Sequence, residues 1–449
     1  MAAAALLMRY RAVRAQSVAL CQPLLPEDTV VQPALDVSPP KWHLAHSTWF
    51  WETMLLGPFL PGYAVFHPGY AFLFNSYYNS LGSRVNRADR GTLSRPPLAE
   101  VYRYRAHVDE HMARLLAPAA APPLPPRALE LLELGLQHEQ QHQELLATDI
   151  KYILSTNALV NEQWAMGNEQ LRTETPALPA HCSLPTARWL KVPGGVHRIG
   201  FQAEAGFCFD NELPAHEVLL ADFELQNRLV TNDEYLAFMA AGGYQDFRYW
   251  LAEGWDLAQR EHWAAPLYWV RPAAAEAAGT AGAAGTGGWR RFSQQLGLQP
   301  LDLAAPVSHV SFYEADAYAA WAGARLPTEF EWEAAARHFG ADDDTAADAG
   351  TWLESNLLDP QPLSAAADPA RCHQLLGDVW QWTYSAYHAY PGYRRAPGPL
   401  GEYNGKFMVN QLVLRGASCA TPQSHARLSY RNFFHADKRW QFTGIRLAR

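Results

Sequence analysis

The spacing of apolar residues changes near residue 172, and this change divides the chain into two kinds of structure. Before it, apolar residues recur at three- and four-residue steps in segments 44–56, 101–116 and 129–154, which is typical of amphipathic helices. With a first helix expected near residues 3–22, these segments predict a bundle of about four helices. The core of such a bundle can hold a metal between facing helices.

The second half of the chain has a different pattern of residues. Beyond a linker predicted at residues 173–187, short apolar runs alternate with glycine, tryptophan, tyrosine and turn sequences such as VPGG at 192–195. This pattern predicts an irregular, loop-rich α+β domain over residues 188–449, with a low-complexity surface loop at 272–288. The expected fold class is therefore two-domain α+β, with the helical domain over residues 1–172.

The composition excludes several classes of protein. The 449 residues carry a formal net charge of −9, without the broad basic field that attracts nucleic acid. The longest apolar runs are too short to span a membrane, and no basic residues precede the apolar stretch of MAAAALLMRYR. We therefore expect a cytoplasmic protein without a signal peptide; its oligomeric state is not indicated. Five widely spaced cysteines suggest no disulfide framework, so a metal would need histidine or carboxylate ligands.

The segment LGLQHEQQHQELL, residues 134–146, carries two histidines one helical turn apart. His138 and His142 lie on one face of a helix, so both imidazoles can reach a single ion. With Glu139 between them, the pattern matches the HExxH of zinc proteases. The polar residues around it are equally typical of a solvated helix face, so a third ligand is needed to decide.

A third ligand is available in DVSPPKWHLAHSTWFWET, residues 36–53, which offers His43 and His46 on a Trp-rich helix. A histidine on such an apolar face is more often a satisfied core residue. Two such helices in one bundle nevertheless allow three neutral nitrogens to meet on one side of a metal. That arrangement leaves positions open for substrates and dioxygen, as in non-heme iron oxygenases.

Several motifs resemble the sulfoxide synthases of ergothioneine biosynthesis. PPKWHLAHSTWFWET, FHPGYAFLFNSYYNSLGSRVNRADRG and LQHEQQHQELL are similar to their DinB-type iron-binding domain. FDNELPAHEV, VSHVSFYEADAYAAWAGARLPTEFEWE, GDVWQWT and VLRGASCATPQSHARLSYRNFF are similar to their second domain, of the formylglycine-generating-enzyme or C-type-lectin-like kind. The resemblance extends over nearly the whole chain. It implies a DinB-like four-helix bundle followed by a formylglycine-generating-enzyme-like α+β domain.

The resemblance also implies a cofactor and a reaction. Family members use Fe(II) and dioxygen to join a sulfur nucleophile to C2 of the imidazole of hercynine. The implied iron ligands are His46, His138 and His142. His43 is then a neighbour, the protease match is accidental, and Glu139 supports the ligands instead of activating water. Cys419 has no second cysteine near it in sequence, so the second domain is expected to form a wall of the binding site and not a copper-thiolate catalyst.

Residues of the first domain take further roles from the resemblance. Tyr77 and Tyr78 match tyrosines that one branch uses as proton or electron donors, with core packing as the alternative. Arg87 and Arg90 match arginines that hold the carboxylate of the sulfur substrate, a group that suits a planar guanidinium. Arginines in a loop are otherwise usually solvated.

The second domain contributes Asn432, Phe433 and Phe434 of the motif SYRNFF. By the resemblance, the amide holds the carboxylate of hercynine and an aromatic face attracts its trimethylammonium group. Packing is the alternative for the two phenylalanines.

The chain departs from the family pattern around the sulfur substrate. Ergothioneine-type members of this branch usually read YYEA followed by GxRHPRxxRG, and GGSCATP near the end. Here Asn79 replaces Glu, Val85 and Asn86 replace His-Pro, and Ala417 replaces Gly. We therefore expect a selenoneine synthase, which joins a selenosugar to hercynine through a C–Se bond. The alternatives are C–S bond formation with cysteine or γ-glutamylcysteine, a zinc protease, and a non-catalytic DinB-like metal-binding protein.

Overall fold

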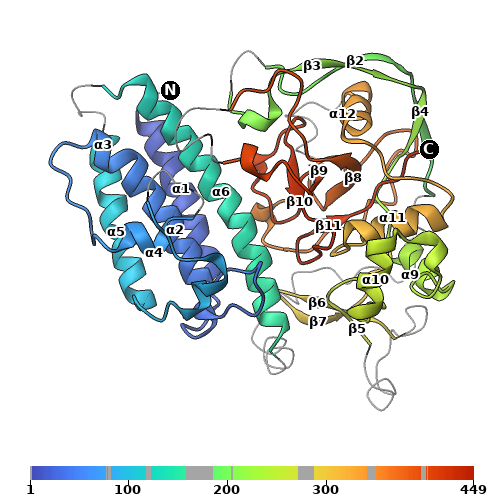
Figure 1. Cartoon of the computed structure of the whole chain (residues 1–449), viewed down its shortest axis with the longest axis horizontal. Coiled ribbons are helices and arrows are strands. Elements are labelled where there is room, and N and C mark those ends of the chain that lie inside the picture. Colours follow the sequence, from blue (N-terminus) through green and yellow to red (C-terminus); the bar gives the residue numbers. More distant parts are fainter. Residues whose placement is uncertain are drawn as a thin grey trace. The chain divides into compact units, whose positions relative to one another are not determined.

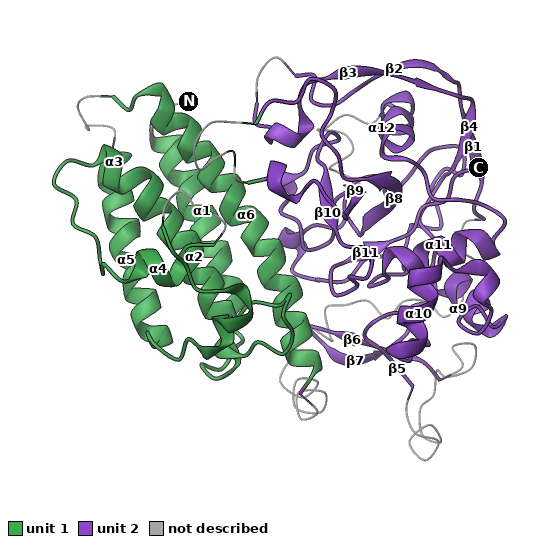
Figure 2. Ribbon diagram, viewed as in Figure 1, with its two compact units in different colours: residues 1–156, 395–403 green, residues 157–394, 404–449 purple. Residues whose placement is uncertain are grey.

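The computed structural model describes residues 3–76, 78, 82–117, 123–157, 186–203, 206–271, 288–340, 350–395, 401 and 403–449. The chain forms two compact units, residues 1–156 with 395–403 and residues 157–394 with 404–449 (Figure 2). Most of the predicted linker at 173–187 and of the predicted loop at 272–288 lies outside the described residues. None of the helices in the described part combines the length and the apolar character needed to cross a membrane.

The first unit is a helical bundle (Figure 1). Its helices are α1 (Ala3–Cys21), α2 (Pro40–Trp51), α3 (Gly57–Phe59), α4 (Tyr70–Phe74), α5 (Leu98–Leu115) and α6 (Pro126–Ser155). Helix α1 packs against α6, and α2 packs against both α5 and α6. A π-helical turn over Glu52–Leu56 continues α2 directly.

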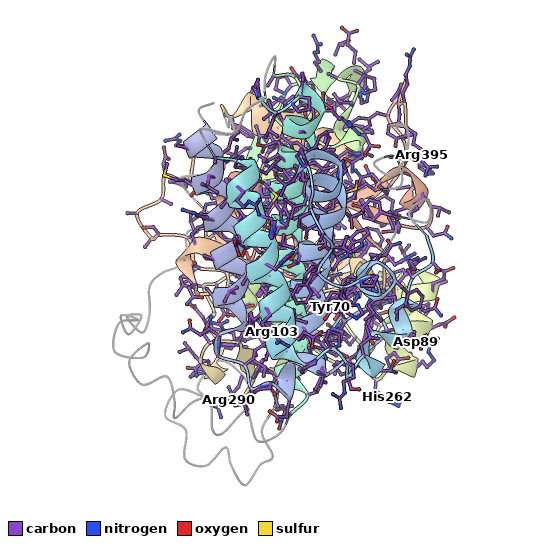
Figure 3. All side chains as sticks on the ribbon, turned by 90° about the vertical axis from the view of Figure 1, so that its left-hand side faces the viewer. Tyr70, Asp89, Arg103, His262, Arg290 and Arg395 are labelled. Carbon is purple, nitrogen blue, oxygen red and sulfur yellow. The ribbon has the colours of Figure 1, made fainter. Side chains whose placement is uncertain are left out.

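Burial explains the positions of these helices. Every residue of α2 from Pro40 to Trp51 is buried, so α2 is the central helix. Helix α5 buries Val101, Tyr104, Val108 and Met112, which are three or four residues apart and form one apolar face. Arg103 lies on its exposed face (Figure 3). Both α2 and α6 begin with a proline at the first helical position, where the missing N–H costs nothing.

The second unit combines short strands with short helices. Its strands are β1 (Trp189–Val192), β2 (Gly195–Ile199), β3 (His216–Leu220), β4 (Phe223–Gln226), β5 (Trp269–Val270), β6 (Arg290–Ser293), β7 (Gly297–Pro300), β8 (Trp380–Ala386), β9 (Leu412–Gly416), β10 (Asn432–Phe434) and β11 (Thr443–Gly444). Its helices are α9 (Asn232–Ala240), α10 (Ala252–Arg260), α11 (Phe312–Trp321) and α12 (Glu329–His338). One helical unit and one unit of mixed strands and helices confirm the predicted two-domain α+β fold class.

The strands form several small sheets. The largest among the described residues has the order β10-β9-β8-β11, in which only the β8–β11 pair is parallel. Separate sheets pair β1 with β4, β2 with β3, and β5 with β6 and β7. In the largest sheet Asn432 lies opposite Leu414 and Trp380 lies opposite Gly416. Strand β10 therefore carries the predicted substrate-binding triplet at one edge of this sheet.

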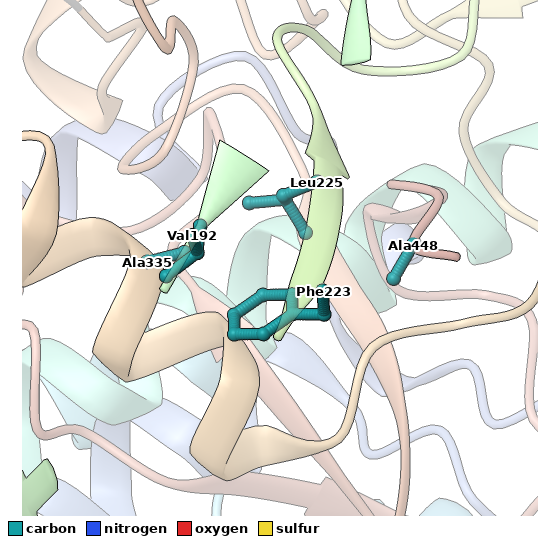
Figure 4. Packing of buried hydrophobic residues seen from close by; sticks show 5 residues of the cluster. All are labelled: Val192, Phe223, Leu225, Ala335 and Ala448. Atoms are coloured by element: carbon teal, nitrogen blue, oxygen red, sulfur yellow. The ribbon is translucent and has the colours of Figure 1, made fainter. Parts of the chain in front are cut away.

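Helix α12 packs across the first strands of this unit. Ala335 of α12 lies against Val192, Phe223 and Leu225 of β1 and β4, and Ala448 completes the cluster (Figure 4). Helices α9, α11 and α12 each begin with a capping box, in which a hydroxyl accepts from the N–H three residues on. The capping residues are Thr231, Ser311 and Thr328.

Candidate metal centre

Three histidines from α2 and α6 meet inside the first unit. His138 and His142 are one turn apart on α6, and their ring centroids are 4.6 Å apart. His46 comes from α2, with its ring centroid 4.6 Å from that of His142 and 5.1 Å from that of His138. One nitrogen from each ring lies within 4.8 Å of the other two. The helix spacing and the packing of α2 on α6 thus bring three potential ligands to one point.

The surroundings keep all three imidazoles neutral. His46 and His138 are buried, whereas His142 is partly exposed. Burial lowers the pKa of His138 to about 3 and lowers the pKa values of His46 and His142 well below the ordinary value. Only a neutral imidazole has a lone pair to offer a metal.

The protein orients the His46 ring on three sides. Its Nδ1 donates to the carbonyl oxygen of Phe74 at 2.5 Å, and this leaves the lone pair on Nε2. The indoles of Trp42 and Trp49 stack on the ring with centroid distances of 4.6 and 5.5 Å. A ligating histidine whose other nitrogen donates to a carbonyl is the usual arrangement at metal sites.

The donor set fits a transition metal that accepts imidazole ligands, a group that includes iron and zinc. The third ring, His138, is stacked on Phe50 with a centroid distance of 4.5 Å. Its buried Nδ1 has no hydrogen-bonding partner in the described part of the chain. The three rings are neutral and offer one nitrogen each within 4.8 Å of the other two, so the cluster can bind a metal.

Glu139 belongs to a different network. Its carboxylate accepts hydrogen bonds from Arg14, Arg105, Ser17 and the indole N–H of Trp51. Burial acts to raise the pKa of Glu139, but the charges of the two arginines and these hydrogen bonds bring it down to about 2. With its oxygens directed at α1, α2 and α5 and at no histidine, Glu139 is not placed to activate water. Its hydrogen bonds go to these four residues and to no described histidine, while its charge acts to raise the pKa of His138. Support of the ligands by Glu139 stays a prediction.

His43 connects the triad to a carboxylate. Its Nδ1 lies 3.0 Å from Nδ1 of His142, and its Nε2 lies 2.9 Å from Oδ2 of Asp149. The same Oδ2 accepts the backbone N–H of Ser38 at 2.8 Å. Burial lowers the pKa of His43, more than the opposing effect of Asp149 raises it. His43 is therefore a neighbour of the triad, linked by hydrogen bonds to one of its members.

Comparisons with known proteins agree with this architecture. The DinB superfamily model matches residues 9–146, and the model of the Sulfatase-modifying factor enzyme 1-like domain matches residues 175–449. The hercynine oxygenases of Mycobacterium tuberculosis and Mycolicibacterium smegmatis are 31% and 32% identical to the chain, and the matches cover 92% of this chain and 91% of each relative. The chain belongs to the hercynine oxygenase family. It is an oxygen-dependent enzyme of the oxidoreductase type, and the predicted family resemblance is confirmed.

The second unit also has relatives outside the hercynine oxygenase family. The formylglycine-generating enzyme of Thermomonospora curvata is 29% identical over 285 residues, which cover 57% of this chain and 91% of that enzyme. Cys419 is buried in this unit and is not part of a disulfide. None of the cysteines in the described part of the chain forms a disulfide: Cys21, Cys208, Cys372 and Cys419.

The tyrosine pair expected from the family is only partly described. Tyr77 and Asn79 lie outside the described residues. Tyr78 is buried, with its ring centroid 5.6 Å from that of Trp49, which stacks on His46. Tyr78 thus lies in the aromatic layer behind the His46 ring, and its role as a donor stays a prediction.

The two arginines of the predicted substrate loop differ in their surroundings. Arg90 is buried, with its two terminal nitrogens 2.9 Å from the hydroxyls of Ser38 and Ser76. Its guanidinium carbon lies 3.4 Å from the ring centroid of Trp42. Arg87 is partly exposed and donates to the carbonyl oxygen of Asp36. Arg90 therefore packs against Trp42 in the wall around the triad, whereas Arg87 lies nearer the surface. Binding of a substrate carboxylate by the two arginines stays a prediction.

The predicted substrate residues of the second unit lie on β10 and are partly exposed. Phe433 stacks on Tyr387 with a centroid distance of 4.1 Å, and the side-chain oxygen of Asn432 accepts the N–H of Phe433 at 2.9 Å. Phe434 makes an edge contact with Trp440 at 5.8 Å. Both phenylalanines thus have packing partners, and the amide of Asn432 retains two N–H donors for a ligand.

Sequence reasoning missed Tyr403. The segment 395–403 is part of the first unit, and the Tyr403 hydroxyl donates to the side-chain oxygen of Gln141, next to His142. The Tyr403 ring centroid is 6.1 Å from that of His138. A separation of 262 residues between Tyr403 and Gln141 leaves no local signal for this contact.

Proposed function

We propose that this chain uses Fe(II) and dioxygen to form a bond between C2 of the hercynine imidazole and the sulfur of a small thiol. One observation carries the proposal: three neutral histidine nitrogens lie within 4.8 Å of one another in a chain 31% identical to a hercynine oxygenase over nearly its whole length. The relatives are named for hercynine, which supports hercynine as one substrate. The ergothioneine-type members that the motifs resemble use a thiol as the other substrate, so we place sulfur before selenium.

Each group in the site has a defined task in this proposal. His46, His138 and His142 hold the iron. Iron bound there would let dioxygen act as the oxidant, which takes up the two electrons and the two protons lost from the imidazole C2–H and the thiol S–H. It would also lower the pKa of a bound thiol, which would react as its anion. The protein contributes neutral ligands, a largely buried setting and the aromatic walls formed by Trp42 and Trp49.

The substrate contacts are assigned by chemistry. Arg87, partly exposed beside the loop that differs from the family pattern, holds the carboxylate of the thiol substrate with its planar guanidinium. Tyr78 donates a proton or an electron from behind His46. Asn432 and the phenylalanines of β10 recognise the carboxylate and the trimethylammonium group of hercynine.

A second candidate is C–Se bond formation with a selenosugar. It is favoured by the replacement of the family's Glu and His-Pro with Asn79, Val85 and Asn86, and Asn86 is exposed. A neutral amide can both donate to and accept from sugar hydroxyls. A selenol ionises more readily than a thiol, so its binding depends less on a charged partner.

Anaerobic loading with Fe(II), followed by air and hercynine with cysteine, γ-glutamylcysteine or a selenosugar, tests both candidates. Mass spectrometry should find a hercynine adduct of a thiol, and oxygen uptake should depend on hercynine. A higher kcat/KM for the selenosugar would favour the second candidate, and the variant N79E/V85H/N86P should then shift preference toward cysteine. The absence of hercynine-dependent oxygen uptake with every partner would reject both.

The same preparation addresses the remaining alternatives. A zinc protease would cleave peptides after loading with Zn(II), which the placement of Glu139 argues against. A non-catalytic metal-binding protein would bind iron and consume no oxygen. The variant H46A is the control, since it should lose hercynine-dependent turnover while the second unit stays folded.

A further inference from the structure

Four hydrogen-bonded groups connect the segment before α2, helix α6 and helix α2: Ser38, Asp149, His43 and His142. Ser38 N donates to Asp149 Oδ2, the same oxygen lies 2.9 Å from His43 Nε2, and His43 Nδ1 lies 3.0 Å from His142 Nδ1. His43 and Asp149 are buried. Two imidazoles that face each other through Nδ1 can form this bond only if one ring donates and the other accepts.

The carboxylate decides which ring donates. Asp149 as a carboxylate can only accept hydrogen bonds, so the proton of the neutral His43 ring must be on Nε2. Nδ1 of His43 then carries a lone pair and accepts. His142 must therefore carry its proton on Nδ1, which places its own lone pair on Nε2. That is the nitrogen left to take part in the triad.

Further contacts hold the chain of groups in place. The hydroxyl of Ser38 accepts from Arg90 at 2.9 Å, and Arg90 also lies over Trp42, the residue before His43. The carboxylate of Asp149 thereby ties α6 to the start of α2. His142 and Asp149 are seven residues apart on α6, which puts both on the face toward His43.

From this geometry we infer that His43 and Asp149 are positioning residues that fix the proton of His142 on Nδ1 and so direct its Nε2 to a metal. The inference rests on the proposed metal site. It assigns a role to His43, to which the family resemblance gives no role in metal binding. A second nitrogen of the triad, on His46, is fixed in the same sense by the carbonyl of Phe74. Outer hydrogen-bonding partners of this kind typically change metal affinity about 10- to 100-fold.

The first test needs no variant. Nitrogen NMR of the full chain labelled with ¹⁵N-histidine, free of metal, reports which nitrogen of each ring carries the proton, and comparison with H142N assigns the His142 signals. We expect the proton of His142 on Nδ1. A proton on Nε2 would overturn the inference.

The second test compares two replacements of His43. H43Q offers an amide oxygen to accept from His142 and an N–H to donate to Asp149, so it preserves the polarity of the chain of groups. H43L removes both contacts. Competition of the full chain with a chelator for Fe(II), and for Zn(II) as a redox-inert probe, should show binding about 10- to 100-fold weaker in H43L and largely restored in H43Q.

Q143L is the matched control, because Gln143 is buried next to His142 but bonds Val13 and Ser17 of α1. It should lower stability and leave metal affinity unchanged. Equal affinity in H43L and the parent chain, or equally weak binding in H43L and H43Q, would reject the inference. Failure of the proposed function looks different: the parent chain would then show the expected proton position and metal affinity without forming a hercynine product.

Discussion

The imidazole of His46 is stacked on the indole of Trp42, with ring centroids 4.6 Å apart and planes 10° from parallel. Arg90 lies over the same indole, so a buried cation, an aromatic ring and a metal-site histidine form one packed column. Arg90 also bonds two serine hydroxyls. Through this stack, the 3-10 helix that carries Arg90, Arg87–Thr92, forms part of the wall around the triad.

Replacement of Arg90 by lysine should therefore lower stability. The planar guanidinium of Arg90 bonds the hydroxyls of Ser38 and Ser76 and stacks on Trp42. The compact ammonium group of lysine cannot make all three contacts at the same time. Leaving buried partners unsatisfied costs about 1–3 kcal/mol. Thermal unfolding should show a lower Tm for R90K, whereas R103K, at an exposed position, should not change it. Unchanged stability combined with a raised KM for the thiol would instead assign Arg90 to substrate binding alone.

Removal of any triad member should abolish tight metal binding. Each of H46A, H138A and H142A leaves two nitrogens where the structure brings three within 4.8 Å. Metal content after Fe(II) loading and dialysis should fall to background while the helical circular dichroism stays near that of the parent chain. The control is H111A, since His111 is on α5 and its Nδ1 bonds the carbonyl oxygen of His107 in the same helix. Retention of stoichiometric iron by H46A would remove His46 from the ligand set.

The helical half of the site could be anticipated from sequence to a large extent. The spacing of His138 and His142 predicts a shared helix face, and the structure shows it. Spacing could not choose between His43 and His46, because residues three apart lie on the same helix face. The choice of His46 came from the family resemblance, and the structure shows why both matter: one joins the triad and the other bonds it.

Other parts of the site had little or no local signal. Arg90 lies in a segment that the sequence predicts as a loop, where charged side chains are usually solvated. The structure forms a 3-10 helix there, Arg87–Thr92, and contacts with Trp42 and two serines bury Arg90. Asp149 did carry a signal, since it follows His142 by two helical turns, but the same spacing is common on ordinary polar helix faces. Tyr403 reaches the bundle from the far end of the chain, and no periodicity reports such a contact.

The charge of Glu139 should make the stability of the bundle depend on pH. Its pKa in the folded chain is about 2, against an ordinary value of 4.5. Because the folded value is the lower one, the stabilisation is complete above pH 4.5 and is lost as the pH falls toward 2. The difference corresponds to about 3 kcal/mol. E139Q should therefore have a lower free energy of unfolding than the parent chain at pH 7. This difference in free energy should become smaller as the pH falls from 4.5 to 2.

Hydrogen exchange of the α6 amides in the intact chain can measure this difference in stability between E139Q and the parent chain. E133Q is the control, because the ion pair of Glu133 with Arg9 is partly exposed and worth at most about 1 kcal/mol. A difference for E139Q that is constant over this pH range would contradict the assigned ionisation. A difference that grows toward acid would reverse the sign of the pKa shift.

Gly135 gives a last prediction, because it lies inside α6 one turn before His138, where glycine weakens a helix. Alanine would normally stabilise such a position by about 1 kcal/mol. Here a methyl group would lie 2.6 Å from the buried indole of Trp51 and 3.1 Å from the ring of Phe50. Neither ring can move freely, since Trp51 bonds Glu139 and Phe50 stacks on His138.

Overpacking of this kind costs about 1–3 kcal/mol, which exceeds the gain in helix propensity. G135A should therefore lower the free energy of unfolding and weaken metal binding, because displacement of Phe50 tilts the His138 ring. Denaturant unfolding and chelator competition measure the two effects. A double variant, G135A/W51F, removes the part of the indole that the methyl group meets and should recover affinity for the metal. Stabilisation by G135A would show that the rings yield, and that α6 does not depend on close approach to α2 at this point.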